Sequence, residues 1–126
     1  MSPRPLTSAR KGAPKGSAKS VVIFVHGYGA NGADLLGLAD PLAPHMRDTA
    51  FYAPDAPENC QGNPMGFQWF PIPWLDGSSE EAALSGQAQA AEDLNAFIDA
   101  VLADEGIPSS ALALVGFSQG TMMSLH

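Results

Sequence analysis

Cysteine and long apolar runs are both scarce in this sequence of 126 residues. Because Cys60 is the single cysteine, an internal disulfide and a metal site built on cysteines are excluded, and we expect a reduced thiol. No apolar run approaches the roughly 20 residues that a membrane-spanning helix requires, and the N-terminus lacks the apolar stretch of a secretory signal. We therefore expect a cytoplasmic protein without an integral membrane segment.

Basic residues are scarce beyond residue 19. From Ser20 onward the sequence has one basic residue, Arg47, against thirteen acidic residues, which gives a net charge of −12. This charge repels a polyphosphate backbone, so nucleic acid is excluded as a partner. The other five basic residues lie in residues 1–19, where Ser, Pro, Gly and Ala favour a solvated, flexible tail in which residues 6–8 could form an edge strand.

The composition beyond the tail, in residues 20–126, is that of one globular domain with buried strands. Apolar stretches at residues 21–25, 49–54 and 111–115 are short and bounded by turn residues. The first of them is mostly β-branched. Stretches of this kind predict strands that are buried on both faces of a sheet.

Helical patterns separate these strands. Leucines at helical spacing predict helical structure near residues 34–42. Asp40 is expected to interrupt it by capping a second short helix. Ser78 and Glu81 form a capping box at the start of a long amphipathic stretch that ends at Gly106. The order of strand and helix predicts an α/β fold, with a parallel sheet and helices on both faces.

Residues 116–120, Gly-Phe-Ser-Gln-Gly, form a G-x-S-x-G pattern directly after an apolar strand and before a helical segment. This is the setting of a nucleophile elbow, in which a serine is held in a strained conformation at the tip of a sharp turn. The residues two before and two after the serine are driven together, so both must be glycine. The pattern identifies Ser118 as a candidate nucleophile; the alternative is a serine that only caps a helix.

A second glycine-rich turn, at residues 26–29, follows the first strand. The oxyanion of acyl transfer needs donors from the residue after the nucleophile and from an early strand-to-helix loop. We expect the backbone N–H groups of Gln119 and Tyr28 to be these donors. His26 lies at the end of a buried strand, so we expect it to brace the turn rather than act as the catalytic base.

The region between the second strand and the long helix, residues 54–77, contains five prolines and three glycines, which predict a long loop without regular elements. Its apolar bulk is too great for a disordered segment. We expect Trp69 and Phe70 to wall an apolar cleft for an acyl chain beside the nucleophile, with Met65 or Trp74 contributing. The alternative is that these side chains only pin the loop to the domain.

The glycine-rich turn after the strand at residues 21–25 also permits a different interpretation. Gly27, Gly29 and Gly32 fit a G-x-G-x-x-G pattern between a strand and a helix. Asp55 follows the next strand, as in a dinucleotide-binding domain. This interpretation leaves the serine turn and the aromatic loop unexplained. A catalytically inactive interaction module is a third interpretation.

Several strings resemble a known family in their sequence and order: "VVIFVHGYGANGADLLGLA", "APDAPENC", "QWFPI" and "GIPSSALALVGFSQG". Over about residues 20–126 the chain is similar to the bacterial form of the carboxylesterase, phospholipase and acyl-protein thioesterase family of α/β-hydrolases. The resemblance implies a serine esterase or thioesterase with no cofactor and no metal. The implied substrates are small-molecule esters or thioesters of small or medium acyl chains, or lysophospholipid-like molecules, and a homodimer is compatible with the class.

The resemblance also implies that Ser118 is the nucleophile, that Tyr28 and Gln119 form the oxyanion hole, and that the acyl pocket lies near the aromatic loop. Thr121 departs from the pattern, because many relatives have a third glycine there, and the change crowds the pocket slightly without altering the chemistry.

The catalytic aspartate and histidine follow the nucleophile in this fold, but only eight residues follow Ser118. His126 would lie about 12 Å further along a helix at about 1.5 Å per residue, too far to reach the serine. His45 has no motif around it. We therefore expect residues 20–126 to be the N-terminal portion of a single α/β-hydrolase domain, truncated after the elbow, with the triad aspartate and histidine beyond it.

Overall fold

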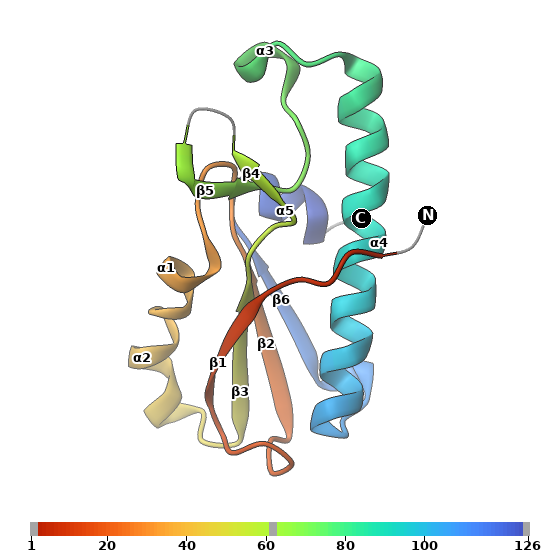
Figure 1. Ribbon diagram of the computed structural model, residues 1–126. Helices are drawn as coiled ribbons and strands as arrows, with labels where there is room; N and C mark the ends of the chain where they lie inside the picture. The colour runs from red at the N-terminus through yellow and green to blue at the C-terminus, as the bar shows by residue number, and fades with distance from the viewer. Residues whose placement is uncertain (1–2, 61–62, 125–126) are drawn as a thin grey trace.

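The computed structural model describes residues 3–60 and 63–124, without the side chains of residues 63–65. Its strands are β1 (Ser8–Gly12), β2 (Ser20–Val25), β3 (Thr49–Pro54), β4 (Glu58–Cys60), β5 (Asn63–Gln68) and β6 (Leu112–Gly116). Four of them form a sheet in the order β1-β3-β2-β6, and the hairpin of β4 and β5 lies beyond one end of it (Figure 1). β2 pairs in parallel with β3 and β6, whereas β1 runs antiparallel to β3. The expected parallel sheet is thus confirmed, with one antiparallel strand at its edge.

The helical segments are α1 (Gly32–Leu36), α2 (Ala39–Leu42), the 3-10 turn η1 (Ala43–His45), α3 (Pro73–Asp76), α4 (Glu80–Glu105), the 3-10 turn η2 (Ser109–Ala111) and α5 (Gln119–Ser124). α4 ends at Gly106, which adopts a left-handed conformation with φ of 68°. Its N-terminal cap is Ser79, one residue after the expected Ser78. Asp40 lies in the first turn of α2 and does not cap it, because α2 follows α1 almost without a break and begins after Leu38.

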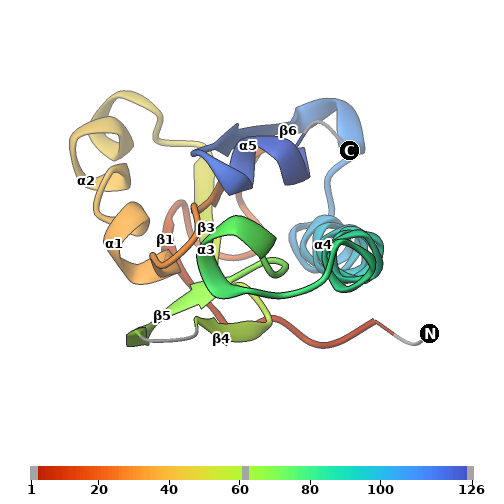
Figure 2. The same cartoon turned by 90° about the horizontal axis from the view of Figure 1, so that it is seen from above.

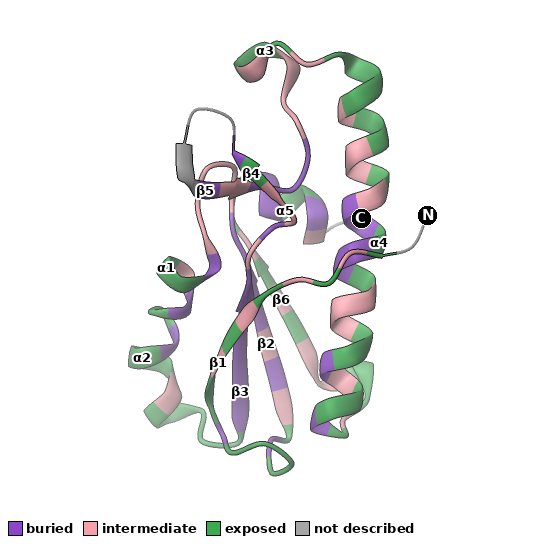
Figure 3. Ribbon diagram, viewed as in Figure 1, coloured by how far each residue is buried: buried purple, intermediate pink, exposed green. Residues whose placement is uncertain are grey.

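Both faces of the sheet are covered because successive side chains of a strand point to opposite sides. Val21 and Ile23 of β2 share a core with apolar residues of α4, whereas Phe24 packs on the other face with residues of α1 and α2. Figure 2 shows these layers, with α1 and α2 on one side of the sheet and α4 on the other. β3 is buried along its whole length (Figure 3), as expected for an interior strand.

The segment expected to be one long loop contains regular elements. β4 and β5 form an antiparallel hairpin, and α3 is a single turn of helix. β5 also pairs with the turn after β2, since Gly29 N–H donates to Phe67 O (2.9 Å) and Phe67 N–H donates to Ala30 O (2.8 Å). The composition of the segment predicts a loop because these pairings depend on partners far away in the sequence.

The N-terminal segment, expected to be a flexible tail in which residues 6–8 could form an edge strand, contributes the edge strand β1 at Ser8–Gly12 and contacts α4. Arg4 donates from its backbone N–H and from Nε to the fully buried carboxylate of Asp93 (2.6 and 2.9 Å). Arg10, on β1, donates from Nε and Nη2 to the buried carboxylate of Glu105 (2.7 and 3.0 Å). Both carboxylates belong to α4. The basic residues dock the segment because each supplies the cation for an acid that would otherwise be buried without an opposite charge.

Candidate active site

Ser118 lies on a sharp turn between β6 and α5, at the carboxyl end of the parallel strands. Its φ is 55°, and no other non-glycine residue in the described part of the chain has a positive φ. A β-carbon at Gly116 would lie 2.6 Å from the Cα atom of Thr121. A β-carbon at Gly120 would collide with the carbonyl oxygen of Val25. Close packing of the turn therefore requires both glycines and holds the serine in its strained conformation.

The turn after β2 packs directly against this elbow. Phe117 N–H donates to the last carbonyl oxygen of β2 (3.0 Å), and a β-carbon at Gly27 would lie 3.0 Å from Ser118 Cβ. Within residues 3–60 and 63–124, no acceptor receives the backbone N–H of Tyr28 or of Gln119. Each of the two turns that meet at Ser118 therefore carries a backbone N–H group without an acceptor among the described residues.

His26 is fully buried behind the turn. Its Nε2 accepts a hydrogen bond from Ala56 N–H (2.9 Å), and its Nδ1 lies 2.7 Å from Gly27 O. Because Nε2 is the acceptor, the ring carries its proton on Nδ1 and donates it to the Gly27 carbonyl. Burial lowers the pKa of His26 and favours the neutral ring. Both ring nitrogens are thus engaged in bracing the turn.

A cavity of about 460 Å³ opens beside Ser118. Most of its lining is apolar, which suits the acyl part of an ester. Its lining residues are Phe70, Pro71, Ile72, Pro73, Trp74, Ala83, Ser118, Gln119 and Met122. Phe70 and Trp74 are therefore in the wall, whereas Trp69 is not. The side chain of Met65, which was also expected there, lies outside the described residues.

Trp69 is fully buried and does not line the cavity. Its Nε1–H donates to His26 O (2.8 Å), and its backbone N–H donates to Gln119 Oε1 (2.9 Å). Gln119 Nε2 in turn donates to Phe70 O (2.9 Å). The indole pins the segment to the turn after β2, and the backbone of Trp69 and Phe70 is held by the elbow through Gln119; both contacts fit the alternative role considered for the aromatic loop. The sequence predicts a role only for the backbone N–H of Gln119 and misses the role of its side chain. The signal that could have indicated it is that a buried amide must find polar partners.

The Tyr28 hydroxyl connects the oxyanion turn to α3. It donates to the carboxylate of Asp76 (3.5 Å), which also accepts from the backbone N–H groups of Ile72 (3.0 Å) and Ser78 (2.9 Å). Burial, with contributions from Cys60 and Asp76, raises the pKa of Tyr28 to about 12, so the phenol is protonated at neutral pH. The hydroxyl therefore has a structural partner on the segment that carries the cavity wall.

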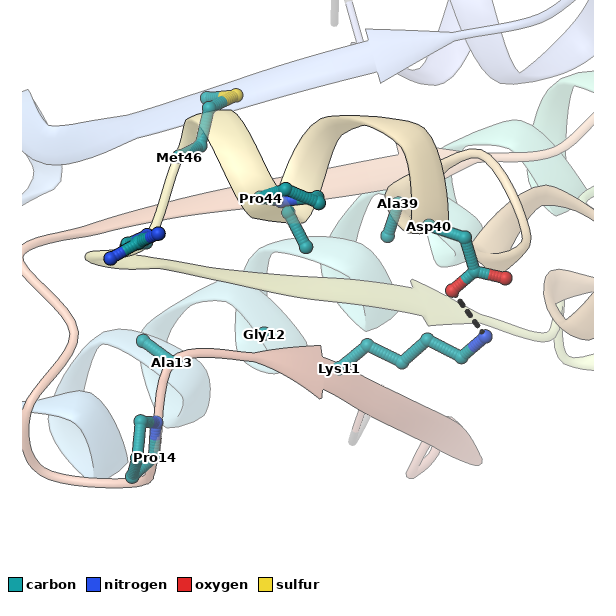
Figure 4. A pocket seen from close by; sticks show the side chains of 10 residues that line it. Lys11, Gly12, Ala13, Pro14, Ala39, Asp40, Pro44 and Met46 are labelled. Atoms are coloured by element: carbon teal, nitrogen blue, oxygen red, sulfur yellow. Dashed lines mark hydrogen bonds and ion pairs between the residues drawn. The ribbon is translucent and has the colours of Figure 1, made fainter.

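A second hollow of about 570 Å³ lies at the opposite end of the sheet, between the end of β1 and the α2–η1 segment (Figure 4). Three charged residues line it, Lys11, Asp40 and Arg47, and the first two form an exposed ion pair at 3.0 Å. The described residues that line it include no serine, cysteine or histidine. Although it is larger than the cavity beside Ser118, the described residues that line it offer only the ion-paired amine of Lys11 as a nucleophile.

The geometry of the glycine turn opposes the dinucleotide interpretation. Gly32 N–H, at the start of α1, donates to Asp55 Oδ1 (2.8 Å), and Asp34 N–H donates to Asn31 Oδ1 (2.9 Å). A pyrophosphate would need these donors and would be repelled by the Asp55 carboxylate. A β-carbon at Gly32 would collide with the Ala53 carbonyl oxygen, so this glycine permits close packing of helix and strand.

Metal-ligating side chains do not gather in the described part of the chain: no group of three His, Cys, Asp or Glu residues there could hold an ion. Over the same residues, no helix has the length and apolar character needed to cross a membrane.

A mostly parallel sheet, helices on both faces and a strained serine turn at the carboxyl end of β6 define the α/β-hydrolase fold. Residues 8–126 match the phospholipase/carboxylesterase family. The chain belongs to this family, and both the fold and the family expected from the sequence are confirmed.

Individual relatives agree with this assignment. The crystal structure of esterase PE8 is 41% identical, with a TM-score of 0.85 over 97% of this chain and 56% of that protein. A rice protein named "Probable carboxylesterase" is 33% identical over 85% of this chain and 42% of its own length. Acyl-protein thioesterase 1 of Cryptococcus neoformans is 32% identical over 89% of this chain and 49% of its own length. The chain spans about half the length of the curated relatives that it matches.

Proposed function

We propose that this chain carries the nucleophile of a serine hydrolase that cleaves carboxylic esters or thioesters through an acyl-enzyme on Ser118. The observation that carries the proposal is the left-handed backbone of Ser118, with φ of 55°, at a turn where two glycines are sterically required. Natural proteins retain such strain at functional sites, where it exposes a reactive group. The relatives named esterase, carboxylesterase and thioesterase support the same class of reaction.

The proposed reaction begins with attack of Ser118 Oγ on the carbonyl carbon of the substrate. The carbonyl electron pair moves onto the oxygen, and the backbone N–H groups of Tyr28 and Gln119 stabilise the resulting oxyanion. Collapse of this intermediate expels the alcohol or thiol and leaves the acyl group on the serine, from which water releases it. A histidine oriented by an aspartate takes up and returns the proton; we infer that both come from the protein beyond residue 126.

The substrate class follows from the cavity beside the serine. Its volume of about 460 Å³ and its apolar lining, with Phe70 and Trp74 in the wall, fit an acyl chain of small or medium length. The substrate is therefore a small-molecule ester or thioester whose acyl part enters this cavity.

The test is made in the full-length protein. A fluorophosphonate probe should label Ser118, and Ser118→Ala should abolish both labelling and hydrolysis of a short p-nitrophenyl ester without unfolding the protein. Ser110→Ala is the matched control, because Ser110 is exposed and lies outside the site, so labelling should persist. Full activity in Ser118→Ala would contradict the proposal. A folded protein that neither reacts with the probe nor cleaves esters would support the inactive interaction module instead.

A further inference from the structure

One short segment, Phe67–Phe70, lies between the two turns that meet at Ser118. On one side, Phe67 exchanges two backbone hydrogen bonds with the turn after β2, donating to Ala30 O (2.8 Å) and accepting from Gly29 N–H (2.9 Å). On the other side, the side chain of Gln119 holds the backbone of Trp69 and Phe70. The segment therefore connects the turn that carries Tyr28 to the elbow that carries Gln119.

The contact on the elbow side depends on a primary amide. Gln119 Oε1 accepts from Trp69 N–H and Gln119 Nε2 donates to Phe70 O, both at 2.9 Å. The three residues are at most 6% exposed, so water cannot readily replace either hydrogen bond. A carboxylate can accept but not donate, a thioether can do neither well, and a shorter amide cannot reach both partners.

The same side chain belongs to the residue whose backbone N–H faces the proposed oxyanion. Gln119 is the first residue of α5 and immediately follows Ser118, so anchoring its amide also limits movement of its backbone donor. Phe70, the other end of the contact, lines the cavity. Two hydrogen bonds thus connect the oxyanion donor to the wall that contacts the acyl chain.

We propose, on the basis of the function inferred above, that the Gln119 side chain is a positioning residue: it fixes the elbow donor relative to the acyl pocket by holding the Trp69–Phe70 backbone. Catalysis should then respond to the hydrogen-bonding character of residue 119 and not only to its volume.

The decisive variant is Gln119→Glu in the full-length protein, measured as kcat and kcat/KM relative to wild type at several pH values. When the introduced carboxyl is ionised, it faces the Phe70 carbonyl oxygen without a proton to donate, and kcat should fall by up to about 100-fold, the lower end of the loss of one oxyanion donor. When it is protonated, it can donate to Phe70 O and still accept from Trp69 N–H. The ratio of variant to wild type should therefore rise as the pH falls through the pKa of that carboxyl, which burial raises above about 4.3.

Two controls separate positioning from packing and from added charge. Gln119→Met preserves the volume without the amide, so its kcat should be low at every pH and its ranking of ester chain lengths should change, because Phe70 is released. Asn95→Asp adds one carboxylate to an exposed position of α4, and its ratio to wild type should stay near one. Gln119→Asn keeps the amide but shortens its reach, so it should lower kcat with only a small change in the midpoint of thermal unfolding. This variant replaces Gln119→Glu in the comparison with wild type if the glutamate variant unfolds above neutral pH.

A wild-type kcat and chain-length ranking in Gln119→Met or Gln119→Asn, or a Gln119→Glu ratio that does not change with pH, would overturn the positioning role. Those results together with an inactive Ser118→Ala variant would leave the proposed function in place. Retained activity in Ser118→Ala would instead contradict the proposed function itself.

Discussion

Gly27 and Tyr28 allow backbone and side-chain roles to be separated within one turn. A β-carbon at Gly27 would lie 3.0 Å from both Ser118 Cβ and Phe117 O, so Gly27→Val should displace the turn from the elbow. Loss of one oxyanion donor costs about 2.7 to 4 kcal/mol of transition-state stabilisation. Tyr28→Phe removes only the hydroxyl, whose partner is Asp76, and should change turnover little. Steady-state kinetics of the two variants in the full-length protein check this contrast, and a large loss of kcat in Tyr28→Phe alone would show that the hydroxyl takes part in catalysis.

Trp69 and Trp74 differ in burial and should therefore differ in effect. Trp69 is fully buried and hydrogen-bonded, so Trp69→Ala should destabilise the protein by about 3 to 5 kcal/mol. It should lower kcat/KM by the same factor for all esters. Trp74 lines the cavity but is 82% exposed, so Trp74→Ala should change stability by only about 0.5 kcal/mol and alter the ranking of acyl chain lengths. Denaturant unfolding and kcat/KM from acetyl to octanoyl esters measure both quantities. An unchanged ranking in Trp74→Ala would remove that residue from the acyl site.

At the scale of elements, β1 is attached to α4 by a charge pair whose acid is buried. The carboxylate of Glu105 accepts from Arg10 and from the Tyr52 hydroxyl. Arg10→Ala leaves that carboxylate without its cation and should destabilise the domain by about 3 kcal/mol. The neighbouring Lys11→Ala is the matched control, because its pair with Asp40 is exposed and contributes about 0 to 1 kcal/mol. Equal losses in the free energy of unfolding for the two substitutions, measured in urea, would contradict a stabilising role of the Arg10–Glu105 pair.

The same cluster predicts how stability depends on pH. The Arg10 guanidinium, aided by the Tyr52 hydroxyl, holds the pKa of Glu105 below its usual value despite burial. A depressed pKa in the folded state contributes stability above about pH 4.3, and this is lost as the pH falls through the folded pKa. Burial and the Glu105 contact raise the pKa of Tyr52 to about 12, so its contribution is present below about pH 10 and is lost as the pH rises through about 12. Urea unfolding of Glu105→Gln should show a weaker acid dependence than wild type; an identical acid limb would exclude Glu105 as its source.

For the molecule as a whole, β6 forms one of the two edges of the four-stranded sheet. Within the described residues no strand pairs with this edge, and Val115, Phe117 and Met122 beside it are at least 37% exposed. Unpaired strand edges with apolar neighbours promote association. The 126-residue chain expressed alone should therefore sediment as oligomers and bind a hydrophobic dye, and Val115→Lys should reduce both effects. A monomeric chain that does not bind the dye would contradict this expectation.

The parts of the fold that the sequence predicts are those with local causes. The strands β2, β3 and β6 are recognisable because each is a short apolar run next to turn residues. α4 is recognisable because its capping serine, its amphipathic pattern and Gly106 all belong to one continuous segment. The elbow is recognisable for the same reason, since two glycines within five residues are what a strained serine needs. These elements account for the fold class and for the candidate nucleophile.

The remaining features depend on partners that are distant in sequence. Composition predicts a free N-terminal tail, but Arg4 and Arg10 meet buried carboxylates on α4, 89 and 95 residues away. The two tryptophans of the loop are alike in composition, and only the tertiary structure buries Trp69 against His26 while it leaves Trp74 at the cavity. The sequence alone thus determined the strand–turn–helix units and the serine they present. Tertiary packing decided the role of each tryptophan and the contact of Gln119 with a backbone 50 residues away. The physical reason is that a buried polar group bonds, and a buried apolar group packs, with whatever partner the fold brings beside it.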